Sequence, residues 1–180
     1  MPFFDVGRPV DEFELTPGMP LPLKVSICDK AQEREGRTTA VLIDSFGYLD
    51  KVEKLRIVVP RRFRTDFASI PGWARRIVSP FGRHAKAAVI HDWLYAIGEP
   101  GRRDIADRVF DHAMEELDVE DGTRELMYGA VRIGGHDGYA NAENDWPATF
   151  ADEITGDQVT PLFERPTAYV DQPNGPQRVP

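Results

Sequence analysis

Two helical patterns joined by one short turn constrain the fold of this chain more than any other feature. Apolar periodicity predicts helices over Arg83–Ile97 and Arg102–Leu117. Between them, Gly98-Glu-Pro-Gly101 contains the residue types that end helices and form tight turns. A connection this short joins neighbouring antiparallel helices, so we expect the two helices to run antiparallel and to touch.

The first of these helices carries ionisable groups inside an apolar run. In the segment Ala87-Ala-Val-Ile-His-Asp-Trp-Leu-Tyr95, His91 and Tyr95 lie one turn apart on the same face, whereas Asp92 points about 100° away. The imidazole and the Asp92 carboxylate therefore serve different partners. One group can handle a proton while the other holds a cation.

The second helix places a carboxylate on its apolar stripe. Asp107 is in line with Phe110, Met114 and Leu117 at helical spacing. An unpaired carboxylate in such a place costs several kcal/mol or becomes protonated, so it needs a partner on the adjacent helix. The candidates are His91, Tyr95 and Arg103. The cluster is either a chemical site or a structural network that ties two helices together, and the pattern alone leaves both open.

Composition excludes several classes of protein. The 180 residues are 41% hydrophobic, which is enough to bury the core of one domain. A net charge of −8 argues against nonspecific nucleic-acid binding, although the segment from Arg61 to Lys86 has seven basic residues and one acidic residue. The single cysteine, Cys28, excludes an intramolecular disulfide and a cysteine-based zinc site. No run approaches the roughly 20 apolar residues of a membrane span.

The order of patterns predicts an α+β fold. Residues 1–60 form a β-rich part, with strands near Leu21–Cys28, Thr38–Asp44 and Leu55–Val59. Residues 61–140 form a small helical bundle that packs on the β-rich part as one compact domain, with further helices at Gly72–Val78 and Asp121–Ile133. Residues 141–180 are acidic and rich in proline, and we expect an extended arm that contacts other subunits.

A loop between the two parts and the start of the His91 helix supply further candidate ligands. Asp66, in Arg64-Thr-Asp-Phe-Ala-Ser-Ile-Pro71, could join the helical carboxylates or cap a turn. His84 continues the face of His91 and Tyr95 at i+7 and i+11. The sequence requires no cofactor, but Asp92, Asp66 and His84 are the predicted ligands if a divalent metal, calcium or zinc, is bound.

Four spaced blocks carry a family resemblance. They are Thr65-Asp-Phe-Ala-Ser-Ile-Pro71, Ala88-Val-Ile-His-Asp-Trp-Leu-Tyr95, Arg103-x-x-Ala-Asp107 and Met127-Tyr-x-Ala-Val-Arg132. In this order they resemble the phage and prophage proteins catalogued as domain of unknown function 1353. The resemblance implies a viral or prophage origin and a place among virion or tail genes, but no activity.

A second likeness concerns chemistry. His91-Asp-x-x-Tyr95 on one helix, with Asp107 on an antiparallel neighbour, is similar to the active site of calcium-dependent secreted phospholipases. The likeness implies that His91 is a general base, that Asp92 binds calcium, and that Tyr95 and Asp107 orient the histidine. The chain departs from those enzymes because it lacks their disulfides and because Val78-Ser-Pro-Phe-Gly-Arg83 matches their glycine-rich calcium loop poorly.

Two classes of function follow. The first, which we favour from the sequence, is a phage virion-associated structural protein of the tail or baseplate region. It would be made in the bacterial cytoplasm and located in the virion, in an oligomeric assembly with other virion or tail proteins and in contact with the host envelope. The second is a metal-assisted hydrolase of a cell-envelope component, lipid or peptidoglycan, that uses His91 and Asp92.

Overall fold

Strands fill the N-terminal half of the chain and helices fill the C-terminal half. The computed structural model describes residues 2–5, 22–27, 33–34, 37–67 and 82–171. In these ranges eight strands precede the first helix, so the predicted α+β class is confirmed. The predicted helix at Gly72–Val78 and Cys28 lie outside the described residues.

The longest strand pairing is an antiparallel hairpin. Strands β6 (Phe46–Asp50) and β7 (Leu55–Val59) pair from Phe46 opposite Val59 to Asp50 opposite Leu55. Strand β1 (Phe3–Asp5) pairs with the other edge of β6. The ring of Phe4 lies so close to Gly47 that a Cβ at this position would come within 2.2 Å of it. Glycine is therefore needed at this position of β6, where Phe4 of the paired strand β1 lies opposite.

A smaller sheet lies next to this hairpin. It contains β2 (Val25–Ser26), β5 (Ala40–Leu42) and β8 (Arg64–Thr65), all antiparallel, with β5 in the centre. Strands β3 (Glu33–Arg34) and β4 (Arg37–Thr38) form a separate hairpin. The three predicted strands correspond to β2, to β4 with β5, and to β7.

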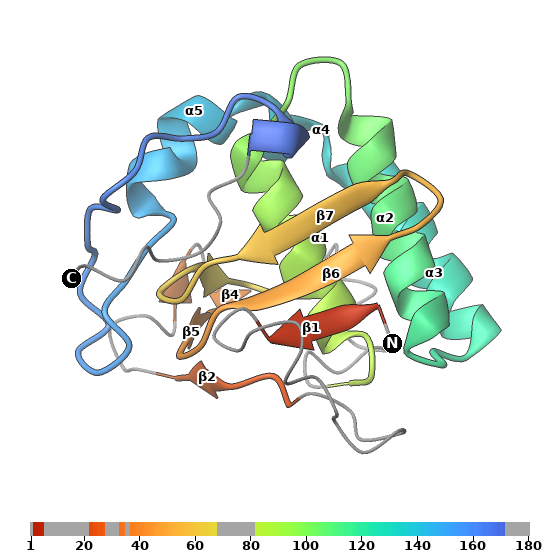
Figure 1. Ribbon diagram of the computed structural model, residues 1–180, viewed down its shortest axis with the longest axis horizontal. Coiled ribbons are helices and arrows are strands. Elements are labelled where there is room, and N and C mark those ends of the chain that lie inside the picture. The colour runs from red at the N-terminus through yellow and green to blue at the C-terminus, as the bar shows by residue number, and fades with distance from the viewer. Residues whose placement is uncertain (1, 6–21, 28–32, 35–36, 68–81, 172–180) are drawn as a thin grey trace.

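The three predicted C-terminal helices are present. They are α1 (Ala85–Ile97), α2 (Arg103–Glu116) and α3 (Asp121–Gly134). Helix α1 ends at Gly98, whose φ of 60° is the left-handed conformation that glycine adopts readily. Helices α1 and α2 pack side by side and antiparallel, as the short turn between them predicted (Figure 1).

Helix α1 forms the centre of the core. It contacts α2, α4 (His136–Ala140), α5 (Ala142–Asp145) and strands β7 and β8 (Figure 1). Its buried side chains point in all directions around the axis; they are Ala87, Ala88, Val89, Ile90, His91, Trp93, Leu94 and Ile97. A helix surrounded in this way offers its polar groups few routes to solvent. Each polar group on it must therefore find a partner inside the protein or line a cavity.

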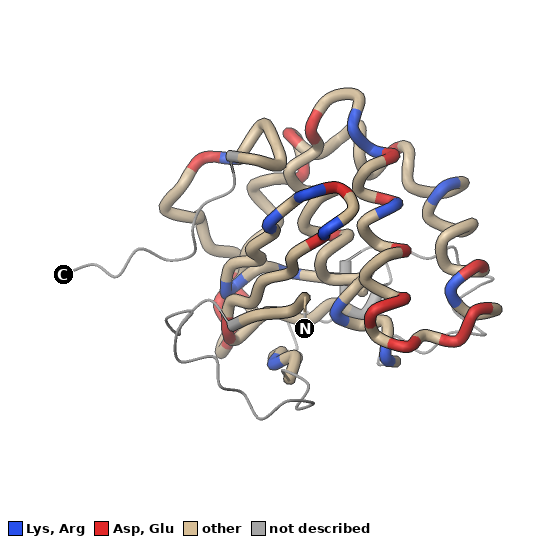
Figure 2. The backbone as a smooth tube through the Cα atoms, turned by 45° about the vertical axis from the view of Figure 1, so that its right-hand side comes forward, with Lys and Arg blue, Asp and Glu red and all other residues tan. Residues whose placement is uncertain are grey.

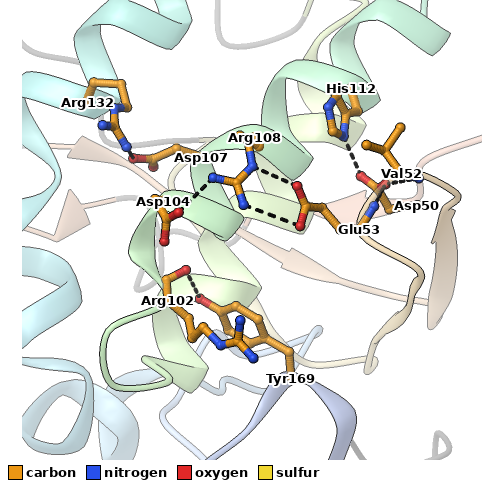
Figure 3. A network of polar contacts seen from close by, with 10 residues as sticks. All are labelled: Asp50, Val52, Glu53, Arg102, Asp104, Asp107, Arg108, His112, Arg132 and Tyr169. Carbon is orange, nitrogen blue, oxygen red and sulfur yellow. Dashed lines mark hydrogen bonds and ion pairs between the residues drawn. The ribbon is translucent and has the colours of Figure 1, made fainter.

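A polar network attaches α2 to the turn of the β6–β7 hairpin (Figure 3). Arg108 donates to Glu53 at 2.7 Å and to Asp104 at 2.7 Å. One turn further along α2, Nδ1 of His112 lies 2.9 Å from a carboxylate oxygen of the buried Asp50. These contacts fix the position of α2 over the sheet.

The C-terminal segment turns back over the body of the chain (Figure 1). It contains α4 (His136–Ala140), α5 (Ala142–Asp145) and two 3₁₀ helices, η3 (Trp146–Ala148) and η4 (Tyr169–Asp171). The sequence predicted an extended arm over residues 141–180. Residues 141–171 contain short helices and pack on their own chain, and residues 172–180 lie outside the described part. Contact of this segment with other subunits stays a prediction.

Aromatic side chains attach this segment to the core. Phe150 forms a β-bridge with Phe63 and packs edge-on against Trp93, Trp146 and Phe163. Near the end of the segment, the hydroxyls of Tyr139 and the buried Tyr169 lie 2.7 Å apart. The segment is thus held at both ends.

None of the helices in the described ranges combines the length and the apolar composition needed to cross a membrane.

Replacing Phe150 tests how much the returning segment contributes to stability. Phe150→Ala removes a side chain that is 3% exposed, and we expect the free energy of unfolding to fall by about 3–5 kcal/mol. Leu162→Ala is the control, because Leu162 is 99% exposed and its loss should change stability by less than about 0.5 kcal/mol. Urea denaturation measures both. Equal stability of the two variants would mean that the segment does not pack on the core.

Candidate functional site

His91 and Asp107 form a buried pair between α1 and α2. The Nε2–H of His91 donates to Oδ1 of Asp107 at 3.0 Å. The two residues are 3% and 0% exposed, respectively. The sequence predicted this pairing from the position of Asp107 on the apolar stripe of α2, and the pairing is present.

Asp107 is the common acceptor of three elements. Its Oδ1 also accepts the Tyr95 hydroxyl at 2.8 Å, from the same face of α1 as His91. Its Oδ2 faces Nη1 of Arg132, on α3, at 3.3 Å (Figure 3). Arg103, the third predicted partner, instead donates to the backbone carbonyl of Arg132 at 3.2 Å. The carboxylate therefore links α1, α2 and α3.

The surroundings of Asp107 keep it ionised. Burial raises the pKa of this carboxyl, but the hydrogen bond and charge of His91 lower it, and so do the Tyr95 hydroxyl and Arg103. The result is a pKa below the usual 3.8. Burial and the charge of Asp107 raise the pKa of Tyr95, so its hydroxyl stays protonated and donates.

His91 also lines a pocket of about 410 Å³. It is lined by residues of α1, the β8 loop, α4 and α5, and among them are His91, Asp92, Tyr95 and Asp66. No described residue hydrogen-bonds Nδ1 of His91. One nitrogen of the imidazole is thus fixed by Asp107, and the ring contributes to the pocket wall.

Asp92 also lines the pocket, but its hydrogen-bond partner lies on strand β8, whereas the partner of His91 lies on α2. The hydroxyl of Thr65 donates to Oδ2 of Asp92 at 2.5 Å, and the same hydroxyl accepts the backbone N–H of Phe67 at 3.0 Å. Phe67 has a φ of 60°, so the loop turns sharply after β8. The hydrogen bond between Thr65 and Asp92 attaches this loop to α1, and the next residue, Asp66, lines the pocket.

The backbone at Gly135 comes close to Tyr95, and both residues line the pocket. At Gly135, where α3 gives way to α4, a Cβ would come within 2.3 Å of the Tyr95 hydroxyl. The absence of a side chain there lets the α3–α4 corner lie directly on Tyr95. The ring of Tyr139, from α4, packs edge-on against Tyr95 at 5.1 Å between centroids. Helix α4 is thereby positioned along the pocket.

The predicted metal ligands do not come together. His84 precedes α1, is buried and is not part of the pocket wall, whereas Asp66 and Asp92 are. Across the described ranges, no three His, Cys, Asp or Glu side chains are grouped closely enough to hold a metal ion. One oxygen of Asp92 already accepts the Thr65 hydroxyl. Metal binding by Asp92, Asp66 and His84 therefore stays a prediction.

Charged residues contribute to the pocket lining. The described residues that line it include Arg64 and four aspartates, Asp66, Asp92, Asp137 and Asp145, of which Asp137 has a side chain that is 98% exposed. Asp137 comes from α4, at the end of the predicted helical part, and Asp145 comes from α5, in the region predicted to be an arm. The contribution of Asp145 was missed because no local pattern shows that residues 141–171 fold back.

All four sequence blocks meet at this site. Thr65 from the first block donates to Asp92 in the second, and Asp107 in the third accepts from residues of the second and from Arg132 in the fourth. The fold and site thus define an α+β protein in which a buried His–Asp pair lies beside a pocket, with the half-buried Tyr95 and the exposed Arg132 bonded to the same carboxylate.

The chain belongs to the family described as protein of unknown function DUF1353, whose model matches residues 40–131. The matched range contains Asp66, His91, Asp92, Tyr95 and Asp107 and ends one residue before Arg132. The family predicted from the sequence is therefore confirmed. Searches of curated proteins and of solved structures gave no significant match.

Asp107→Asn tests the charge of the buried acceptor. Neutral asparagine leaves Arg132 and His91 without the anion, so we expect the free energy of unfolding at pH 7 to fall by about 3 kcal/mol. Because the folded-state pKa of Asp107 is depressed, its stabilisation is complete above its unfolded value near 3.8 and is lost as the pH falls through the folded value.

The difference in stability between wild type and Asp107→Asn should therefore shrink below about pH 4. Denaturant titrations from pH 7 to pH 2 measure it. Asp118→Asn is the control, because Asp118 is exposed and its φ of 51° is one that asparagine adopts readily. A constant difference over the whole pH range would show that Asp107 is not charged in the folded protein.

Proposed function

We propose that this protein is a hydrolase in which His91 is the general base that activates water. The observation that supports the proposal is that the two ring nitrogens of His91 have different surroundings. Nε2 donates to a buried carboxylate, and no described residue bonds to Nδ1 of a ring that lines a pocket. A histidine that only tied two helices together would not need to face a cavity.

The network around Asp107 sets the state of His91. Because the Asp107 carboxylate can only accept, Nε2 carries the proton and Nδ1 is the basic nitrogen. When Nδ1 takes a proton from water, the positive imidazolium is stabilised by the negative Asp107 at 3.0 Å. Tyr95 and Arg132 hold the carboxylate in place, so Asp107 is a positioning residue. The water oxygen attacks a carbonyl carbon bound in the pocket as its proton moves to Nδ1. The acyl C–O or C–N bond then breaks, and the imidazolium returns that proton to the alcohol or amine that leaves.

The relation of His91, Tyr95 and Asp107 supports the likeness to secreted phospholipases, in which a tyrosine and a distant aspartate orient the base. Asp92 departs from that likeness, because it accepts the Thr65 hydroxyl and no set of side-chain ligands surrounds it in the described residues. We therefore assign no step to a metal. The proposed substrates are acyl esters or amides of the bacterial cell envelope.

A virion-associated role in the tail or baseplate region remains a second proposal. Its support is the likeness of the four blocks to phage and prophage proteins. The two proposals are compatible, because a phage particle must breach the cell envelope, and a hydrolase in the virion would serve both. Electron microscopy of particles labelled through a tag on this chain would test the location independently of activity.

Replacing His91 tests the catalytic proposal. The assay would screen acyl nitrophenyl esters, phospholipid vesicles and purified peptidoglycan with wild type, His91→Ala and the control His136→Ala. Loss of a general base typically lowers the rate by about 10²–10⁴-fold, and we expect this of His91→Ala. His136 is exposed and is not part of the pocket wall, so its replacement should leave the rate unchanged.

Two further measurements separate catalysis from folding. Thermal unfolding establishes that His91→Ala is folded at the assay temperature. Added imidazole should restore part of the activity of that variant, because it can occupy the space left by the side chain. Hydrolysis that is equal in wild type and in folded His91→Ala would refute the assignment of His91 as base.

A further inference from the structure

We infer that Gly138, on α4, determines the width of the group that the pocket admits beside His91. Gly138 lines the pocket together with His91 and Tyr95. Among the described atoms, a Cβ at Gly138 would meet only Cδ1 of Tyr95, at 4.0 Å, which is an ordinary van der Waals distance. The missing side chain of Gly138 therefore leaves space in the pocket next to the Tyr95 ring.

This space lies close to the proposed base. The rings of His91 and Tyr95 pack against each other, with 4.1 Å between their centroids and 38° between their planes. Both rings come from the same face of α1, and both residues line the pocket. A side chain that filled the space next to Tyr95 would therefore narrow the pocket beside His91.

Two glycines of the pocket wall have different reasons to be glycine. At Gly135 a Cβ would come within 2.3 Å of the Tyr95 hydroxyl and 2.7 Å of the Val131 carbonyl oxygen, so the packing of the backbone requires glycine there. Gly138 has no such contact in the described structure, and its φ is not in the left-handed region. Glycine is a poor helix former, so it weakens α4 without a packing reason. The open space that it leaves in the pocket is a functional reason.

The next residue, Tyr139, fixes the position of α4 relative to Tyr95. Its ring packs edge-on against Tyr95, at 5.1 Å between centroids. Its hydroxyl donates to the backbone carbonyl of Glu99 and lies 2.7 Å from the hydroxyl of the buried Tyr169. Helix α4 is thus attached both to α1 and to the C-terminal segment. With the backbone held in this way, the size of the side chain at position 138 determines the free width next to Tyr95.

The property that this wall selects is size, and charge is secondary. Asp66, Asp92 and Asp145 each interact with other groups of the chain, and the side chain of Asp137 is 98% exposed. Acidic residues also gather at the turn between α2 and α3 (Figure 2), and no residue of that turn lines the pocket. The wall around Gly138 therefore discriminates between ligands by their shape.

The width of the pocket names a substrate class for the proposed hydrolase and, to that extent, the inference rests on the proposed function. A carbonyl carbon attacked by water at His91 must lie within reach of the imidazole through that water. The group attached to this carbonyl would then occupy the space between Gly138 and Tyr95. The favoured substrates are esters or amides that carry a ring or a branched group there, because such groups pack well on an aromatic face. The restriction of width does not depend on hydrolysis.

The experiment labels the full chain with dimethyl, diethyl and dibenzyl dicarbonate, which acylate imidazole nitrogen and differ in width. Mass spectrometry of the peptides gives the rate at His91, with His112 as the internal reference because it is not part of the pocket wall. Wild type should react at His91 with all three reagents. In Gly138→Leu we expect the ratio of the dibenzyl rate to the dimethyl rate at His91 to fall by about tenfold or more. Gly138→Ala should lower the same ratio by a smaller factor.

Gly129→Leu is the matched control. Gly129 lies on α3, outside the pocket wall, and a Cβ there would meet no described atom within 4 Å. Its ratio should equal that of wild type, and thermal unfolding establishes which variants are folded. If Gly138→Leu does not fold, Gly138→Ala decides. An unchanged ratio in a folded Gly138 variant, an equal fall in Gly129→Leu, or failure of dimethyl dicarbonate to label His91 in wild type would overturn the inference.

Hydrolysis of nitrophenyl acetate and nitrophenyl phenylacetate by the same samples separates the inference from the proposed function. If Gly138→Leu changes the labelling of His91 as expected but no ester is hydrolysed, the assignment of Gly138 stands and the catalytic proposal fails. If hydrolysis depends on His91 but Gly138→Leu changes neither the labelling ratio nor the preference between the two esters, the catalytic proposal stands and the assignment of Gly138 fails.

Discussion

The buried carboxylate of Asp107 is the constraint on which the other elements depend. With no exposed surface, this charge must be compensated inside the protein. Compensation comes from His91 and Tyr95 on α1 and from Arg132 on α3. The three long helices are therefore fixed relative to one another by one side chain. Helix α2, which carries it, is fixed to the β6–β7 turn by Arg108 and His112 (Figure 3).

The pairing of His91 and Tyr95 with Asp107 could be predicted because local information was sufficient. The short turn determined that α1 and α2 are neighbours, and the apolar stripe showed that Asp107 faces inward. The role of Arg132 was missed, since it depends on where α3 packs, 25 residues further along the chain. The contact of Thr65 with Asp92 was missed for the same reason, because a loop and a helix separated by 27 residues meet only in the folded protein.

The same difference between local patterns and contacts distant in sequence explains which strands and helices could be predicted. Long amphipathic helices and the apolar strand β7 have strong periodic patterns, and they were predicted. Strand β6 has Gly47 in its interior, where glycine is unfavourable for a strand, and only the crossing of Phe4 accounts for it. Residues 141–171 have no periodic pattern, because contacts such as that of Phe150 with Phe63 hold them, and intrinsic propensity contributes little. One aspartate of the pocket lining, Asp145, comes from this segment, so its place in the site could not be predicted.

Two aspartates near His91 have different environments, and this contrast supports a chemical role over a purely structural one. Asp107 is buried and bonded to groups that keep it charged, so it can only orient the imidazole and stabilise its protonated form. Asp92 lines a pocket, where one of its oxygens accepts the Thr65 hydroxyl. A helix-locking network needs only the first of these carboxylates.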